Sequence, residues 1–243
     1  MSSGKARRPA WPTEEYEVTF QIALIGKDGL VVGSDRKVSY LTEGTAGQHI
    51  AAEKYIEGAD KSIVCFFAGS PLASNIARRI ASTCANVLTD EPQWGILLAQ
   101  AADNVAGPSL PSLAMIDEVL VVRPDVPKAV WLVSKLQPNP ASVQTVTETI
   151  CTGANLTSRF LPRYLWSPLP LDTLRDLALL TLSFAERENP SGVGRGFDVL
   201  TLEKGNGFKW TTHSPESAKK SADQFLSGLH DLFKGWSQTP WFR

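Results

Sequence analysis

Two polar residues frame the first strongly apolar stretch of the chain: Thr19 opens it, and Asp35 closes it sixteen positions later. Apolar residues alternate from position 20 to 24, and Asp28-Gly29 is a strong turn signal, so residues 19–35 are expected to form a β-hairpin. Since a hairpin brings its outer ends together, Thr19 and Asp35 should be neighbours. A threonine hydroxyl becomes a nucleophile when a base removes its proton, so this pair could do chemistry.

The elements that would support this pair follow in blocks. Another strand is expected at 37–41, and the apolar stretch KSIVCFFAG reads as a further strand. Ser70-Pro71 predicts the start of a helix, because serine is a preferred N-cap and proline is tolerated at the first helical position. An apolar stripe at helical spacing follows it, formed by Leu72, Ile76, Ile80 and Cys84. A second helix is expected at 93–105.

The second half of the chain repeats this alternation of blocks. A hairpin is expected at 118–136, helices near 156–165 and at 172–187, a third hairpin at 197–213, and a last helix from Ser214-Pro215 onward. Blocks of strands and helices favour antiparallel sheets covered by helices over a parallel sheet. We therefore predict an α+β fold, a four-layer αββα sandwich of two antiparallel sheets. Residues 1–18 are interpreted as a flexible arm or propeptide, and 19–243 as a single domain.

Composition narrows the possible partners of this 243-residue chain. The net charge of −1 without a clustered basic face argues against nucleic acid, and no segment is apolar enough to span a bilayer, so we expect a cytoplasmic protein that binds no membrane. Three cysteines are too few for a disulfide framework and should be buried thiols: Cys65, Cys84 and Cys151. The histidines are scattered, and we expect neither a metal nor another cofactor: His49, His213 and His230.

Three stretches carry a resemblance to a known family: TFQIALIGKDGLVVGSDRK, AEKYIEG, and IVCFFAGS before a helix. They resemble the N-terminal half of a proteasome β-type subunit, or of the related bacterial proteasome-like peptidase. Both are N-terminal nucleophile hydrolases with the αββα sandwich. The likeness runs along nearly the whole chain from Thr19 and is strong to about Ile80, then again at GANL and NPSGVG.

The resemblance implies a set of catalytic residues. The nucleophile would be Thr19 at a mature N-terminus, Asp35 the aspartate sixteen residues on, and Lys54 the catalytic lysine. The N–H of Gly69, in the Ala68-Gly69 turn, would serve the oxyanion. Supporting positions would be Thr152, Glu188 and Ser191, with threonine replacing serine and glutamate replacing aspartate. The resemblance also implies an apolar substrate pocket, which favours cleavage after hydrophobic residues and is formed by Val38, Ala52, Ile56 and Phe67.

These roles make chemical sense together. A free α-amino group on Thr19 would have a pKa near ~8 and could take the hydroxyl proton. A nearby Lys54 ammonium would lower the pKa of the amine and of the hydroxyl, and Asp35 would hold that lysine. The predicted function is thus threonine-type hydrolysis of peptide bonds in a peptide or protein substrate, through an acyl-enzyme, in a ring of identical or related subunits.

Two residues depart from the family pattern. Val18 stands where glycine usually precedes the threonine, and Phe20 stands where threonine or serine usually follows it. Without removal of residues 1–18, Thr19 has no free amine. Two alternatives therefore remain: a catalytically inactive structural subunit that retains its arm, and an N-terminal nucleophile amidase for small molecules.

Overall fold

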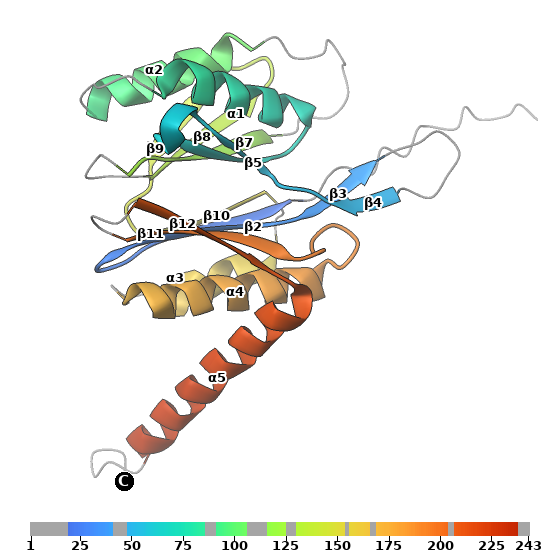
Figure 1. Ribbon diagram of the computed structural model, residues 1–243, viewed down its shortest axis with the longest axis vertical. Helices are drawn as coiled ribbons and strands as arrows, with labels where there is room; N and C mark the ends of the chain where they lie inside the picture. Colours follow the sequence, from blue (N-terminus) through green and yellow to red (C-terminus); the bar gives the residue numbers. More distant parts are fainter. Residues whose placement is uncertain are drawn as a thin grey trace, which may run out of the picture.

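The computed structural model describes residues 19–40, 48–85, 91–105, 116–124, 130–153, 156–165, 169–203 and 207–237. Figure 1 shows them as four layers: a helix pair, two stacked sheets, and a second group of helices. The predicted αββα sandwich is confirmed. The arm predicted at residues 1–18 lies outside the described residues.

The sheet that carries Thr19 at its margin has five antiparallel strands in the order β10-β1-β2-β11-β12. Their bounds are β1 Phe20–Ile25, β2 Gly29–Asp35, β10 Thr149–Gly153, β11 Phe197–Glu203 and β12 Gly207–His213. The facing sheet has the order β5-β6-β7-β8-β9. Its strands are β5 Tyr55–Glu57, β6 Val64–Ala68, β7 Ile116–Val122, β8 Val130–Leu136 and β9 Ser142–Thr145. A separate hairpin of β3 (Lys37–Tyr40) and β4 (Gln48–Ala51) extends beyond the sheets (Figure 1).

Helices cover the outer face of each sheet. The β5–β9 sheet is covered by α1 (Pro71–Cys84) and α2 (Glu91–Asp103). The other sheet is covered by α3 (Leu161–Leu165) and α4 (Leu171–Glu188), with the 3₁₀ helices η1 (Ala59–Lys61) and η2 (Thr157–Phe160) in connections. The last helix, α5 (Pro215–Ser237), packs its first turns on α4 and then projects from the body (Figure 1). No described helix is long and apolar enough to cross a bilayer.

Strand β1 lies in a middle layer and contributes apolar side chains to the cores on both of its faces. Phe20, Ile22 and Leu24 belong to the core under α4, whereas Ala23 belongs to the core between the two sheets. Alternate side chains of a strand point to opposite faces, so a strand in a middle layer must be apolar on both. Burying the β1 side chains from Phe20 to Leu24 fixes the register, because a one-residue slip would exchange the two cores.

The predicted elements are largely present, with three added strands, of which β4 pairs with β3. The start of α1 is confirmed, since Ser70 caps it by accepting from the N–H of Leu72 at 3.1 Å. All three cysteines are free and buried, as predicted. Strands β4, β9 and β10 were not predicted, because QHIA, SVQT and TICTG are short and carry polar residues. Strands β9 and β10 form by pairing with β8 and β1, which the local pattern does not reveal.

Candidate active site

The site begins where the ends of β1 and β2 meet. Gln21 pairs with Ser34, so Thr19, one residue before β1, lies beside the end of β2. There the backbone N–H of Phe20 donates to Oδ1 of Asp35 at 2.9 Å. The hairpin therefore brings Thr19 and Asp35 together as the sequence predicts.

Lys54 joins the two residues. Its Nζ lies 2.9 Å from Oγ1 of Thr19 and 3.0 Å from Oδ2 of Asp35. The three side chains are almost fully enclosed, with exposed fractions of 3% for Thr19, 2% for Lys54 and 0% for Asp35. Such an ion pair is screened little by solvent, so the lysine charge acts strongly on the threonine hydroxyl.

Asp35 is surrounded by donors. Oδ1 accepts from the N–H of Phe20, and Oδ2 accepts from Lys54 and, at 3.0 Å, from the N–H of Lys37. Complete burial raises the pKa of the Asp35 carboxyl above its ordinary value, and the charge of Lys54 with the two backbone N–H groups opposes that rise. The carboxylate thus anchors the lysine and the start of β1 at once.

The backbone of Lys54 is itself held by the strand that leads to Gly69. The carbonyl of Lys54 accepts from the N–H of Phe67 at 3.1 Å, and Gly69 follows two residues later with a φ of +121°. Glycine adopts this conformation without the steric penalty of a Cβ. A Cβ there would also lie 2.7 Å from Oδ1 of Asp117, whose same atom accepts from the N–H of Ser70 at 2.7 Å. Asp117 therefore fixes the turn that starts α1.

Strand β10 closes the site from the other side. A Cβ added to Gly153 would lie 2.0 Å from the carbonyl oxygen of Thr19 and 3.3 Å from Cβ of Ala68. The N–H of Gly153 donates to Oε2 of Glu118 at 2.6 Å. Burial raises the pKa of Glu118, while this N–H and the charge of Arg159 oppose the rise. Thr19, the Ala68-Gly69 turn and β10 therefore converge.

The supporting residues predicted from the resemblance have other partners. Thr152 donates its hydroxyl to Oε1 of Gln21 at 3.2 Å, on the strand next to Thr19. Glu188 ends α4 and accepts from the backbone N–H groups of Thr157 and Ser158. Ser191 donates to Oδ1 of Asn189 at 2.8 Å. Hydrogen bonds recorded among the described residues join neither Glu188 nor Ser191 to Thr19, Asp35 or Lys54.

The loop of Ser191 is nevertheless tied to the site. Nζ of Lys37, two residues after Asp35, donates to the carbonyl of Pro190 at 2.8 Å. The N–H of Arg36 donates to the carbonyls of Gly194 and Gly196 at 3.1 and 3.0 Å. The 190–196 loop thus docks on the segment that follows Asp35.

The residues expected to line a substrate pocket lie in segments next to those of Asp35 and Lys54 or pack against a core. Val38 is half-buried in β3, and the N–H of Ala52 donates to the carbonyl of Arg36 at 2.8 Å. Ile56 and Phe67 are half-buried against the core beneath α1 and α2. Both side chains therefore contribute to that core.

Sequence reasoning missed Asp117, Glu118 and Gln21. Asp117 and Glu118 lie side by side in the otherwise apolar β7, and Asp117 is 3% exposed. A pair of acids in such a strand is the signal that could have drawn attention to them, since carboxylates are seldom buried without partners. Within the described ranges, no cluster of three His, Cys, Asp or Glu side chains is arranged to hold a metal ion.

The fold and this arrangement were compared with known proteins. No protein-family profile and no curated protein sequence matches the chain. Solved structures do match. The helical assembly of the Anbu complex from Pseudomonas aeruginosa has a TM-score of 0.63 and 19% identity, over 91% of this chain and 98% of that one. The chain has the fold of Anbu proteins.

Two further Anbu structures agree. The Anbu (Gly-1) mutant from Hyphomicrobium sp. strain MC1 has a TM-score of 0.63 and 15% identity, over 89% of this chain and 97% of that one. Anbu from Yersinia bercovieri, described as an ancestral β-subunit, has a TM-score of 0.63 and 15% identity, over 91% and 97%.

These matches correct the resemblance inferred from the sequence. The similar structures are Anbu proteins, rather than the proteasome β-type subunit or bacterial proteasome-like peptidase named above. The family was misassigned because the residues behind the resemblance are not specific to one family. The residues behind the resemblance form the first hairpin, the lysine segment and the turn before α1, which build the common fold of N-terminal nucleophile hydrolases. Such a framework does not distinguish one branch of that fold from another.

Proposed function

We propose that this chain is a threonine-type hydrolase of the N-terminal nucleophile class, with an Anbu-like fold, that cuts peptide bonds after residues 1–18 are removed. The observation that carries the proposal is Nζ of Lys54, 2.9 Å from Oγ1 of Thr19 and 3.0 Å from Oδ2 of Asp35. A buried lysine held against a threonine hydroxyl favours formation of the attacking oxyanion.

In the proposed reaction, Oγ1 of Thr19 attacks the carbonyl carbon of the scissile peptide bond. The free α-amino group of Thr19 takes the hydroxyl proton and passes it to the departing amine, which leaves an ester on Thr19. The N–H of Gly69 stabilises the oxyanion of the tetrahedral intermediate. Water then attacks the ester, with the amine again acting as base, and releases the carboxylic acid. Lys54 and Asp35 remain an ion pair throughout.

The substrate preference proposed for this site is hydrophobic. Val38, Ala52, Ile56 and Phe67 are all apolar and half-buried, and we propose that the parts of these side chains left outside the core would desolvate an apolar side chain on the acyl side of the cut bond. Thr152, Glu188 and Ser191 would support the site through the segments that they hold, namely β10 and the loops beside η2 and α4.

We further propose that the chain works as an oligomer. The Pseudomonas aeruginosa Anbu structure is described as a helical assembly, so an open helical arrangement of copies is a competitor to the ring expected from the sequence. Subunits that repeat head to tail close into a ring only if their rotation allows it. Electron microscopy of the purified protein distinguishes closed rings from open spirals.

A catalytically inactive subunit that retains its arm is the second candidate. Val18 favours this candidate, because a β-branched residue crowds the peptide bond that would have to be cut before Thr19. Phe20, whose side chain is fully buried, also departs from the threonine or serine that usually follows the nucleophile. A small-molecule amidase is the third candidate, because the same nucleophile could attack the amide bond of a peptide or of a small molecule.

The decisive experiment measures the intact mass of the purified chain together with its hydrolysis of fluorogenic peptides and small amides. A mature chain that begins at Thr19, with peptide hydrolysis reduced at least about 10³-fold by Thr19→Ala, is expected. Thr19→Ser should retain activity, and Thr83→Ala, an exposed threonine on α1, should change nothing. A retained arm with no hydrolysis would favour the structural subunit, and hydrolysis of small amides alone would favour the amidase.

A further inference from the structure

Strand β7 supplies none of the catalytic residues that the resemblance implies, but it carries two acidic residues next to each other, Asp117 and Glu118. Side chains of neighbouring residues in a strand point to opposite faces. Val119, on the face of Asp117, belongs to the core beneath α1 and α2, whereas Leu120, on the face of Glu118, belongs to the core between the two sheets. One strand therefore presents a carboxylate to each of two layers.

The carboxylate on the helix side holds the turn of the proposed oxyanion donor. Oδ1 of Asp117 accepts from the N–H of Ser70 at 2.7 Å, and the Asp117 side chain is buried. Gly69 directly precedes Ser70, and a Cβ on Gly69 would lie 2.7 Å from that same oxygen. Asp117 thus contacts the peptide unit between Gly69 and Ser70. Loss of this carboxylate would remove the acceptor of that N–H and leave room for the turn to rotate.

The carboxylate on the other face holds the strand that contacts the nucleophile. Oε2 of Glu118 accepts from the N–H of Gly153 in β10 at 2.6 Å. A Cβ on Gly153 would lie 2.0 Å from the carbonyl oxygen of Thr19 and 3.3 Å from Cβ of Ala68. Ala68 is also the register partner of Glu118 on β6, and β7 and β10 contact each other across the two layers. The bond from Gly153 to Glu118 therefore holds the backbone of Thr19 against the strand that leads to Gly69.

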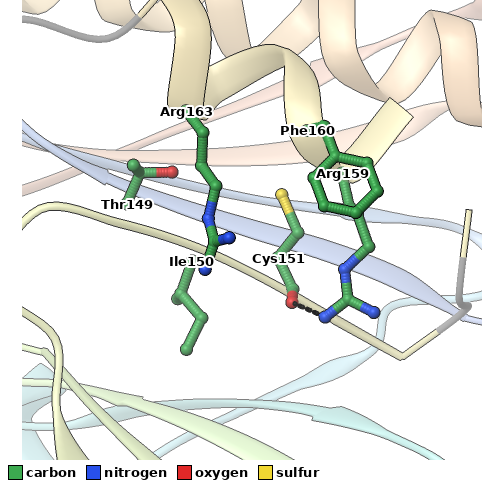
Figure 2. Close-up of a pocket in the computed structure, with 6 residues that line it drawn as sticks. All are labelled: Thr149, Ile150, Cys151, Arg159, Phe160 and Arg163. Atoms are coloured by element: carbon green, nitrogen blue, oxygen red, sulfur yellow. Dashed lines mark hydrogen bonds between the residues drawn. The ribbon is translucent and has the colours of Figure 1, made fainter. Parts of the chain in front are cut away.

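Arg159 of η2 supports this second contact. Its Nη2 donates to the carbonyl of Cys151 at 3.4 Å, two residues before Gly153, as Figure 2 shows. Burial raises the pKa of the Glu118 carboxyl, and the N–H of Gly153 and the charge of Arg159 oppose that rise. Arg159 thus binds the strand that Glu118 holds and favours the ionised carboxylate, which is the stronger hydrogen-bond acceptor.

We propose that Asp117 and Glu118 are a pair of positioning residues that set the separation between the N–H of Gly69 and the hydroxyl of Thr19. This role rests on the proposed function, in which that N–H stabilises the oxyanion formed when the hydroxyl attacks. Both groups must then lie about 3 Å from the reacting atoms, and a misplacement of ~1 Å can cost about 10²-fold in rate. Because the two carboxylates belong to adjacent residues of one strand, they keep the two segments in a fixed relation.

Hydrolysis of fluorogenic peptides by variants of the chain tests the pair. Asp117→Ala and Glu118→Leu are each expected to lower kcat about 10- to 100-fold and to change KM less than about twofold, because the separation matters only in the transition state. Asp117→Asn and Glu118→Gln keep an oxygen that accepts from the backbone N–H, so they should retain most of the activity. A merely structural role would not combine a loss confined to kcat with rescue by the amide.

The matched control is Asp28→Ala. Asp28 also accepts from a backbone N–H, that of Leu171 at 2.9 Å, but it lies in the turn at the far end of the β1–β2 hairpin from Thr19. This variant should lose stability and keep the kcat of the unmodified chain. Urea denaturation gives the free energy of unfolding of each variant, and kcat is compared at a temperature where all variants are folded.

Hydrogen exchange measured by mass spectrometry follows the two segments without any need for hydrolysis. Asp117→Ala should accelerate exchange most in residues 68–73 and Glu118→Leu most in residues 149–153, whereas Asp28→Ala should alter neither segment. This exchange pattern in a chain that hydrolyses no peptide would support the pair and count against the proposed function. Losses in kcat no larger than that of Asp28→Ala, or unchanged exchange in both segments, would overturn the positioning role.

Discussion

Gly153 of β10 approaches Thr19 so closely that a Cβ at position 153 would lie 2.0 Å from the Thr19 carbonyl oxygen. The φ of Gly153 is +82°, in the region that residues with a Cβ rarely adopt. The approach depends on glycine for two separate reasons, contact and conformation. Strand β10 therefore contributes directly to the position of the candidate nucleophile.

Gly153→Ala is predicted to destabilise the fold by more than about 3 kcal/mol, because the methyl group would force backbone atoms apart at an already unfavourable φ. Urea denaturation measures the loss. Gly207→Ala is the matched control, since Gly207 has a φ of +72° but nothing within 4 Å of its Cβ position. That control should cost about 1 kcal/mol, the conformational part alone. Equal losses in the two variants would show that the contact with Thr19 is unimportant.

Asp35→Asn is predicted to cost about 3–5 kcal/mol, because it leaves the buried ammonium of Lys54 without a counter-charge. Adding Lys54→Met should cost less than the sum of the two single changes, since the double variant has no unpaired charge. Asp172→Asn is the control: Asp172 forms an ion pair with Arg175 at 3.2 Å while 87% exposed, so it should cost under about 1 kcal/mol. Additive losses for Asp35 and Lys54 would contradict the coupling.

Glu188→Gln is predicted to reduce stability at neutral pH and to have less effect in acid. The N–H groups of Thr157 and Ser158 hold the pKa of Glu188 below its ordinary value of 4.5. A lowered pKa in the folded state means that the stabilisation is complete above 4.5 and is lost as the pH falls through the folded pKa. Melting temperatures of the two proteins should differ at pH 7 and converge in acid. A difference that stays constant with pH would refute this role for the carboxylate.

Thr152→Val is predicted to cost about 1–3 kcal/mol, because the isosteric side chain leaves the buried Oε1 of Gln21 without its hydroxyl donor. Thr152→Ser keeps the hydroxyl and should lose less. Thr201→Val, which removes a hydroxyl that donates to the carbonyl of Lys209 at 3.2 Å, serves as a comparison on the same sheet. Chemical denaturation of the three variants measures the free energy of unfolding that each one loses. A Thr152→Val variant as stable as the unmodified chain would show that the hydrogen bond to Gln21 does not stabilise the site.

Local patterns were sufficient for much of the fold. The first hairpin was predictable from alternating apolar residues and Asp28-Gly29, and α1 from Ser70-Pro71, because turns and caps depend on neighbours in the chain. Strands β9 and β10 were missed because their short polar segments are stabilised by β8 and β1, far away in sequence. Their pairing energy comes from partners that no local window contains.

The candidate site divides in the same way. The spacing of Thr19 and Asp35 determined their meeting, because one hairpin joins them, and the resemblance supplied Lys54 as their partner. Only the tertiary structure decided that Gly153 contacts Thr19. It also decided that Asp117 holds the turn before α1 and that Glu118 holds β10. Glu188, which the resemblance placed in support of the nucleophile, accepts hydrogen bonds from η2. These relations are contacts between separate layers and strands. Their geometry is set by how two sheets stack and order their strands, which depends on the burial of the whole core at once.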